Sequence, residues 1–440
     1  MTSYFSKNTI FTGLFFFFAL FSLFVLRPFR NTIAADIGTG DLTFYLLIVV
    51  VVMLLVNPIY SLIVSRVRLS KLVPSIYGFF ILCLCGFYFT YSYLPDIFAV
   101  KTIFYVWYNI FNFFVVAIFW AMTVNSFDIE DGKKFFGIIS GFGSLGASCG
   151  GALVDGFLYD KENLSLLIAV SSLLLSIFFS SHVQRKEITL NTSGDNMLVA
   201  GLIPSSALEQ FSQIRTNPLI RQFVLYAFVW TCLSTALWFF QLEIINNYTM
   251  ELAQDQKAIQ GLEDEEKLAN FLSAEKTRIF GRADSIVPLI TLFVQIFLAA
   301  SILKSKMLGI KFVLTVYGLI FSLAFLAVSG YFSDYLLASS AVLIFLILQG
   351  VMRPFEYGLN KPAREAVYTT LNSKEKYKST VFIDTFTNRF GDASGGLLFN
   401  MLFSLGLVAY VAPLAIIPLA IYLMYLGLGI SKSVSVVKSK

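Results

Sequence analysis

Residues 10–26 read IFTGLFFFFALFSLFVL, an uncharged run that is followed at once by Arg27 and Arg30. Roughly 20 apolar residues are needed for a helix to cross the hydrocarbon part of a bilayer. The run is long for the apolar core of a secretory signal, and no clean small-residue cleavage site follows it. We therefore interpret residues 10–30 as a first membrane-spanning helix and not as a removable leader.

The composition of the whole chain predicts a protein that folds in lipid. Of its 440 residues, 57% are hydrophobic and only 13% are charged, whereas soluble domains carry about 25% charged residues. So little charge cannot coat a water-soluble globule of this size. Strands would be shorter and would alternate in polarity, so we expect the spans to be helices.

Twelve apolar segments have the length of a membrane helix. They lie at residues 10–30, 42–64, 72–94, 101–124, 134–158, 164–182, 219–244, 283–303, 311–331, 335–358, 378–404 and 407–430. The sequence therefore predicts an all-α integral membrane protein with twelve transmembrane helices.

Basic residues gather in every second connection between these spans. On one side lie Arg66, Arg68, Lys71, Lys133, Lys134, Arg185, Lys186, Arg215, Lys304, Lys306, Lys311, Lys374, Lys376, Lys378, Lys432, Lys438 and Lys440. The short connections on the other side hold little beyond Lys101 and Lys161. Because cytoplasmic loops carry the excess of lysine and arginine, we expect both termini in the cytoplasm, with a bacterial inner membrane as the location.

Two polar stretches interrupt the apolar pattern. Residues 183–215 form a cytoplasmic linker that separates residues 1–182 from residues 216–430, and a cytoplasmic tail follows at 431–440. Residues 247–282 alternate acidic and basic side chains. We expect an extramembrane helical insertion there, and a solvated face explains its charges more simply than a binding site does.

The two halves of the chain repeat each other. Ser65-Arg66, Lys71, Val73 and Tyr77-Gly78 return 240 positions later as Ser305-Lys306, Lys311, Val313 and Tyr317-Gly318. Lys133, Gly146 and Gly150-Gly151 return 245 positions later as Lys378, Gly391 and Gly395-Gly396. Both blocks relate spans of the same direction, so the repeat is parallel, with six helices followed by six. This is the arrangement of the major facilitator fold, in which substrates bind between two lobes near the middle of the membrane.

Charged side chains inside the spans are the candidate functional residues, because burying a charge in the membrane is costly unless it is paired or hydrated. They are Arg27, Arg30, Glu243, Asp284, Arg353, Glu356, Asp384, Arg389 and Asp392. Arg27 and Arg30 have no acid within a helical turn, so each needs a partner from another helix or from a substrate, unless it extends to the outer interface.

The eleventh span has one polar face, because Asp384, Asn388 and Asp392 are spaced four apart. This face cannot point at lipid. It either lines a cavity or belongs to a structural network of ion pairs, in which Arg389 with Asp392 and Arg353 with Glu356 would be the local pairs.

Other residue types give weaker indications. The single histidine, His182, is expected at an interface, with a proton relay as the alternative. The four cysteines lie in apolar stretches without a CxxC pair, so no metal site, disulfide or cofactor is predicted. The glycines of the fifth span, from Gly137 to Gly151, indicate close helix packing or a helix that slides or rocks. No P-loop is present, so ATP-driven pumping is not indicated.

Three parts of the sequence resemble the nucleotide translocases, which are the ATP/ADP exchange carriers of plastids and intracellular bacteria, and their bacterial relatives. The similar residues are Leu26-Arg27-Pro28-Phe29-Arg30; Phe119-Trp120 with Gly132-Lys133-Lys134-Phe135-Phe136-Gly137; and Lys361-Pro362-Ala363-Arg364-Glu365 through Lys376, Lys378, Ile383-Asp384, Arg389 and Gly391. The resemblance implies a twelve-helix major facilitator fold and antiport of a phosphorylated anion, which arginine binds through forked hydrogen bonds.

Two departures from that family bear on the substrate. The glutamate of the family's fourth span falls near Tyr108 and Asn109 here, and the lysine that follows the glycine matching Gly391 is replaced by Asp392. A reversed charge at a substrate-facing position argues against the same polyanionic substrate, so the resemblance carries the fold over but not ATP/ADP exchange.

We therefore expect a secondary active transporter and not an enzyme: a monomeric antiporter of an organic anion, phosphorylated or nucleotide-like, with membrane lipid around it and no nucleic-acid partner. Arg27, Arg30, Arg353 and Arg389 are the expected anion contacts, and Asp384, Asp392 and Glu356 are the expected coupling or gating residues. Replacing Arg27 or Arg30 by alanine is expected to abolish uptake and leave folding largely intact. The alternatives are a proton-coupled transporter of a neutral or cationic solute, with Asp384 and Asp392 as the proton site, and a membrane enzyme or receptor that does not transport.

Overall fold

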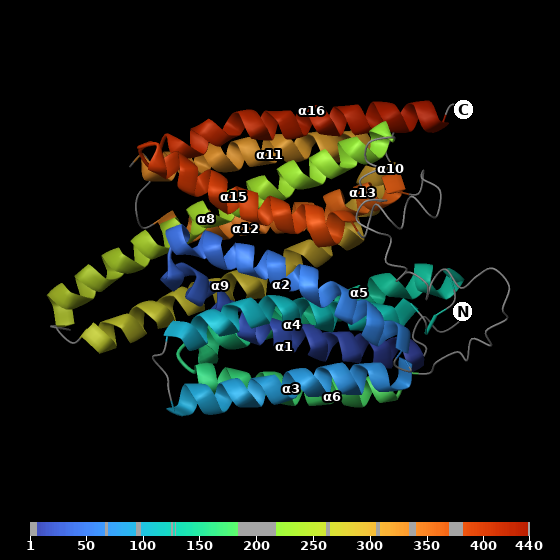
Figure 1. Cartoon of the computed structure of the whole chain (residues 1–440), viewed down its shortest axis with the longest axis horizontal. Helices are drawn as coiled ribbons and strands as arrows, with labels where there is room; N and C mark the ends of the chain where they lie inside the picture. Colours follow the sequence, from blue (N-terminus) through green and yellow to red (C-terminus); the bar gives the residue numbers. More distant parts are fainter. Residues whose placement is uncertain are drawn as a thin grey trace. The chain divides into compact units, whose positions relative to one another are not determined.

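The computed structural model of the chain is built from long helices (Figure 1). It describes residues 7–66, 69–93, 98–124, 126–127, 129–183, 217–260, 265–304, 309–333, 340–368 and 382–438. Apart from its first residue, the predicted linker at 183–215 lies outside the described residues.

The helices of the first half follow the predicted spans closely. They are α1 (Lys7–Ile37), α2 (Thr39–Arg66), α3 (Leu69–Tyr93), α4 (Phe98–Val124), α5 (Ile129–Leu153) with the π-helix η1 (Val154–Leu158), and α6 (Glu162–Ser181). Between α1 and α2 the backbone reverses at Gly38, whose φ of 81° lies in the left-handed region that glycine adopts without strain.

The helices of the second half are more often interrupted by π-helical turns. They are α8 (Pro218–Gln260); α9 (Glu265–Phe293) with η2 (Val294–Leu298) and α10 (Ala299–Lys304); α11 (Gly309–Phe332); α12 (Ala341–Phe355) with η4 (Glu356–Asn360) and α13 (Lys361–Tyr368); η5 (Ile383–Thr387) with α15 (Asn388–Ser404); and α16 (Ala412–Lys438). Within the described residues, eleven helices are long and apolar enough to cross a membrane. The remaining predicted span corresponds to η5 and α15, which carry the charges of Asp384, Arg389 and Asp392.

The chain divides into two compact units. The first comprises Met1–Asp36, Pro58–Leu202 and Leu252–Leu292, and the second comprises Ile37–Asn57, Ile203–Glu251 and Phe293–Lys440. The units therefore differ from the predicted domains 1–182 and 216–430 by an exchange: most of α2 belongs to the second unit and most of α9 belongs to the first.

In the first unit, glycines bring α5 into backbone contact with α1 and α9. A Cβ atom at Gly146 would overlap the carbonyl of Phe17, and one at Gly150 would lie 2.9 Å from the carbonyl oxygen of Phe21. A Cβ atom at Gly151 would overlap the backbone of Asp284 on α9. The glycine-rich fifth span is thus a packing surface that is used on two sides.

In the second unit, the glycines of α15 make the corresponding contacts. Gly395 lies against the backbone of Cys232 on α8, and Gly396 lies against Thr43 of α2. The first glycine of each repeated pair therefore packs on the first helix of its own half, and the second packs on the exchanged helix. This agrees with a parallel repeat of six helices and gives a physical reason for the exchange of α2 and α9.

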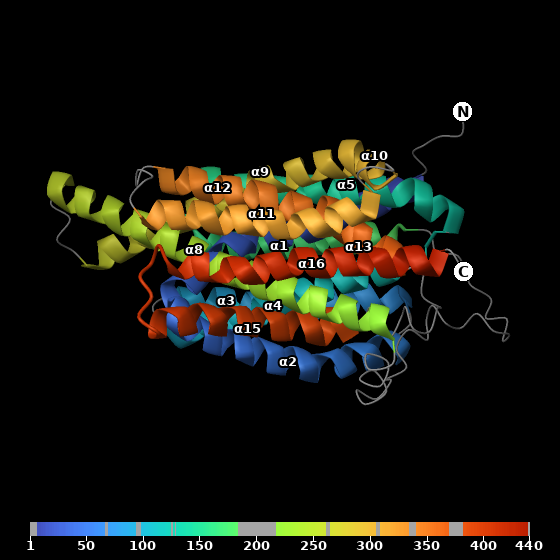
Figure 2. The same ribbon diagram turned by 90° about the horizontal axis from the view of Figure 1, so that it is seen from above.

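The predicted insertion at 247–282 is helical where it is described. In Figures 1 and 2, α9 begins well beyond the adjacent ends of α1 and α4, which belong to the same unit. Glu265, Glu266 and Lys267 are exposed there, whereas Lys276 and most of the residues after it are buried in the first unit. The exposed part of α9 is therefore its beginning, and the position of the insertion outside the membrane stays a prediction.

Candidate functional site

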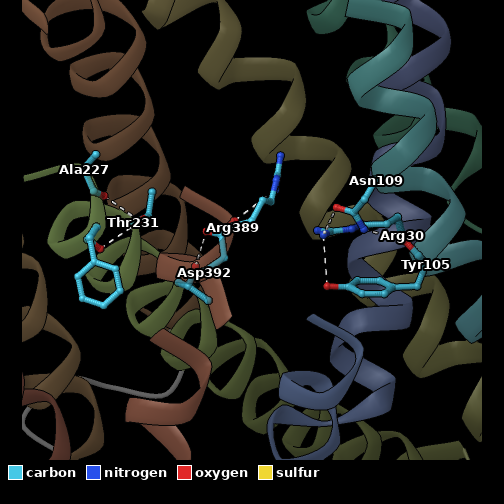
Figure 3. Close-up of polar contacts among 9 residues, drawn as sticks. Arg30, Tyr105, Asn109, Ala227, Thr231, Arg389 and Asp392 are labelled. Carbon is cyan, nitrogen blue, oxygen red and sulfur yellow. Dashed lines mark hydrogen bonds and ion pairs between the residues drawn. The ribbon is translucent and has the colours of Figure 1, made fainter. Parts of the chain in front are cut away.

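Arg30 lies at the centre of a polar cluster in the first unit (Figure 3). Its Nη1 donates a hydrogen bond to Oδ1 of Asn31 at 3.1 Å, and its Nη2 donates to the Tyr105 hydroxyl at 3.3 Å and to Oδ1 of Asn109 at 3.2 Å. The guanidinium carbon lies 4.6 Å from the centre of the Tyr105 ring, which is a cation–π distance. Among the residues that the structure describes, no carboxylate pairs with Arg30.

The acceptors around Arg30 are held by their own hydrogen bonds. The amide nitrogen of Asn109 donates to the carbonyl of Tyr105 at 2.8 Å, so its oxygen is left for Arg30. The Tyr108 hydroxyl donates to the carbonyl of Leu23 at 2.8 Å and ties α4 to α1. Asn109 lies about 16 Å along α4 from Phe98, at 1.5 Å per residue. Arg30 is therefore held against α4 by acceptors that are themselves fixed.

Arg27 has a different partner from Arg30. Its Nη1 lies 3.7 Å from Oδ1 of Asp284 on α9, and the Arg27 side chain is 26% exposed while that of Asp284 is 1% exposed. The guanidinium carbon also lies 4.9 Å from the ring of Phe24. The acid that the sequence places at the opening of the eighth span thus neutralises Arg27.

Further ion pairs join α9 to α1 and η1 in the first unit. Nζ of Lys276 lies 2.8 Å from Oδ1 of Asp36. Oδ1 of Asp155 lies 3.3 Å from Nη2 of Arg282 and 3.7 Å from Nε of Arg278. Sequence reasoning did not select these residues, because their partners lie far away in the chain, 240 positions in the case of Lys276.

In the second unit, Arg389 and Asp392 form the local pair that their spacing predicts (Figure 3). Nη1 of Arg389 lies 3.2 Å from Oδ2 of Asp392, and the other carboxylate oxygen accepts a hydrogen bond from the Thr235 hydroxyl at 2.9 Å. Both charged side chains are about one-third exposed, at 32% and 29%. The predicted partner on the same face, Asp384, has its side chain outside the described part of the structure.

Glu356 is the centre of a buried network in the second unit. Its carboxylate accepts hydrogen bonds from Nη2 of Arg364 at 2.7 Å and from the amide of Asn360 at 2.6 Å. Tyr226 donates to the amide oxygen of Asn360 at 2.9 Å, and the guanidinium carbon of Arg364 lies 4.3 Å from the ring of Trp230.

The ion pair of Glu356 is therefore with Arg364 beyond the π-helical turn η4, and not with Arg353 as the spacing suggested. Arg353 is half-buried on α12. Sequence reasoning missed Arg364 as a site residue, although it belongs to the Lys361–Glu365 motif on which the family resemblance rests.

Comparison with known proteins supports the fold. The sequence matches no protein-family model and no curated protein. The structure is similar to that of a nucleoside transporter, NupG, in a mutant form, with a TM-score of 0.62 and 14% identity over 96% of this chain and 99% of that chain. It is similar to a POT family transporter in complex with a thioalcohol-conjugated peptide, with a TM-score of 0.61 and 13% identity over 97% and 96% of the two chains. A bacterial homolog of the human lysosomal transporter Spinster, inward-facing and unoccupied, gives a TM-score of 0.52 and 12% identity over 99% and 96%.

These structures share the arrangement of helices over nearly the whole chain. The protein is therefore a multi-pass membrane protein with the major facilitator fold, as the twelve spans and the parallel repeat predicted. The resemblance to nucleotide translocases is a finer statement, and it stays a prediction, as do the orientation of the termini and the location in a bacterial inner membrane.

Proposed function

We propose that the chain is a secondary active transporter that exchanges organic anions and that Arg30 is its main contact with the anion. The observation that carries the proposal is the neutral surroundings of Arg30: three hydrogen-bond acceptors and one aromatic ring hold the guanidinium, and none of them carries a negative charge.

A cation at this depth is costly to maintain unless something compensates its charge. The three acceptors orient Arg30 but do not neutralise it. An anionic substrate would supply the missing charge through forked, charge-assisted hydrogen bonds, which arginine forms with carboxylate and phosphate groups. The positive charge of Arg30 would then be balanced only while the substrate is bound.

The other predicted anion contacts are less available. Arg27 is paired with Asp284, and Arg389 is paired with Asp392. Either arginine would contact an anion only if its carboxylate released it. We therefore rank Arg30 first, with Arg389 and Asp392 as a pair whose opening would accompany coupling or gating.

The proposal is tested in two stages with purified protein. A thermal-shift screen against nucleotides, sugar phosphates, carboxylates and amino acids identifies ligands, because a compound that binds only the folded state raises its apparent stability. Hits are then assayed in proteoliposomes, where an exchanger takes up labelled anion only when unlabelled anion is enclosed inside. Arg30→Gln is expected to abolish the exchange, and uptake of anions by this variant at the wild-type rate would contradict the proposal.

A proton-coupled transporter of a neutral or cationic solute is the second candidate. It is favoured by the contact of Asp392 with Thr235 on a neighbouring helix, because a carboxylate held by a hydroxyl and an arginine can exchange its partners when it binds a proton. In this case an imposed proton gradient would drive uptake without any enclosed solute. Asp392→Asn would abolish the gradient-driven uptake, and Arg30→Gln would leave it unchanged.

A further inference from the structure

We propose that the site at Arg30 takes one singly charged anionic group, so that the substrate is a monoanion such as a monocarboxylate, a sulfonate or a phosphodiester and not a polyphosphate. This inference rests on the proposed function and adds to it the charge of the substrate. Its support is the distribution of paired and unpaired charges around the helices that hold Arg30.

In the described parts of α1 and α9 that surround Arg30, one cation has no carboxylate partner. Besides Arg30, the cations from Arg27 to the end of α1 and from Lys276 to the end of α9 face carboxylates: Arg27 faces Asp284, Lys276 faces Asp36, Arg282 faces Asp155, and Arg278 faces Asp155 and Glu275. These described segments, with Asp155 and Glu275, hold five cations and four carboxylates, so the charge that a bound group must balance there is one. A group with several negative charges would leave the remainder uncompensated in a medium where such charges are costly.

Two arginines in the described part of the second unit are paired with carboxylates as well. Arg389 is neutralised by Asp392, and Arg364 is neutralised by Glu356. A nucleoside diphosphate or triphosphate would need several phosphate-binding cations, and these arginines could serve only after losing their carboxylates.

The hydrogen-bonding capacity of Arg30 agrees with this charge count. A guanidinium has five N–H donors, and neutral acceptors of the protein take three of them. One of the remaining donors is on Nε, which is buried and has no hydrogen-bond partner in the described structure. The remaining capacity is therefore two donors, one on Nε and one on Nη1, which is too few for a group with many anionic oxygens.

The first experiment measures how affinity depends on ligand charge at constant shape. The probes are the pairs butyrate and succinate, benzoate and phthalate, and the methyl ester of uridine 5′-phosphate and uridine diphosphate, titrated in a thermal-shift assay of the purified full-length protein. We expect singly charged members to raise the melting temperature and the doubly or multiply charged partners to bind at least about 10-fold more weakly. Tighter binding of the multiply charged members, or no stabilisation by any singly charged probe, would overturn the inference.

A second experiment places a carboxylate beside Arg30 without removing it. Asn109→Asp supplies a negative charge at the position of the amide oxygen, and Asn109→Leu is the matched control. Both variants lose the same hydrogen bond to the Tyr105 carbonyl. We expect Asn109→Asp to weaken monoanion binding by about 10- to 150-fold more than Asn109→Leu does, the range of a charge-assisted hydrogen bond, because only the aspartate neutralises Arg30. Equal affinities of the two variants would refute the single-charge site.

The outcomes separate this inference from the function on which it rests. If the protein exchanges anions but prefers multiply charged ones, the inference of a single-charge site is wrong and the proposed anion exchange stands. Proton-driven uptake of a neutral solute, unaffected by either Asn109 variant, would remove both.

Discussion

At the scale of single residues, Arg27 and Arg30 are identical side chains on one helix that meet different partners in the folded protein. They are three residues apart on α1, so they share one face of the helix. Arg27 meets the buried carboxylate of Asp284, whereas Arg30 meets a tyrosine and two asparagines. The same residue type therefore has a carboxylate partner at one position and neutral partners at the other.

The ion pair changes the expectation for Arg27. Arg27→Ala would leave the carboxylate of Asp284, which is 1% exposed, without its positive partner. We expect the apparent stability to fall by about 1–3 kcal/mol, the cost of an unsatisfied buried group. The double variant with Asp284→Asn should recover most of the loss in a thermal melt of the purified protein. If Arg27→Ala melts like the wild type and loses only uptake, the arginine contacts substrate and the pair is incidental.

Variants of Glu356 and Arg364 test whether this ion pair couples transport or only stabilises the packing of the helices. Glu356→Gln leaves a buried arginine without its carboxylate, which we expect to destabilise the protein by about 3–5 kcal/mol. Glu356→Gln combined with Arg364→Met removes both charges and keeps a long side chain against Trp230, so stability should return.

The transport activity of this double variant decides the role of the pair. A stable protein whose uptake no longer depends on the counter-substrate identifies Glu356 as a coupling residue. Coupled exchange at the wild-type rate would show that the network only joins α8, α12 and α13.

At the scale of elements, the glycines of α5 and α15 set how close the helices approach. Small residues let backbones come together, and a Cβ atom at Gly146 would overlap the carbonyl of Phe17. By contrast, Gly137 lies on the same helix with no atom of another element within 4 Å of a Cβ placed there. The sequence showed the glycine cluster, but only the packing shows which of these glycines are needed for the close approach of two helices.

These two positions form a matched pair of substitutions. Gly146→Ala is expected to destabilise the protein by about 1–3 kcal/mol through overpacking against α1. Gly137→Ala is expected to be neutral or stabilising by up to about 1 kcal/mol, because alanine favours a helix over glycine. Thermal melts of the two variants in the same detergent measure the difference. Equal melting temperatures would mean that α5 and α1 separate easily at Gly146, as a sliding helix would.

At the scale of the whole molecule, the exchange of α2 and α9 between the units is the main difference from the domain boundaries read from the sequence. Gly396 holds α2 in the second unit, together with the hydrogen bond from Asn400 to Thr43 at 2.9 Å. Gly151, with the ion pairs of Lys276 and Arg282, holds α9 in the first. The two-fold relation of the two six-helix halves stays a prediction, and their superposition should place Gly146 on Gly391 and Tyr77 on Tyr317.

The orientation of the chain in the membrane is tested from outside the cell. In a variant without the four native cysteines, a cysteine at Gln260 is expected to react with an impermeant thiol reagent in intact cells, because the basic loops place the opposite face in the cytoplasm. Reaction only after lysis would invert the topology. A cysteine near the C-terminus, which is expected to react only after lysis, is the control.

The amino-acid sequence was enough to predict the approximate bounds of most spans and the fold. These depend on hydropathy summed over about 20 consecutive residues, and such a sum is a local property that tertiary contacts do not alter. The absence of an acid within a helical turn of Arg30 can also be read from the sequence, because spacing along one helix is a local property, and the role of Arg30 in binding stays a prediction.

The pairs in which charges are neutralised follow from the packing of the helices. Asp284 pairs with Arg27, Asp36 pairs with Lys276, and Glu356 pairs with Arg364 and not with Arg353. Ion pairs form between atoms within about 4 Å of each other, and helices that are distant in the sequence reach that separation only through packing. The exchange of α2 and α9 has the same origin, because the close approach at Gly151 and Gly396 depends on the facing helix as much as on the glycine.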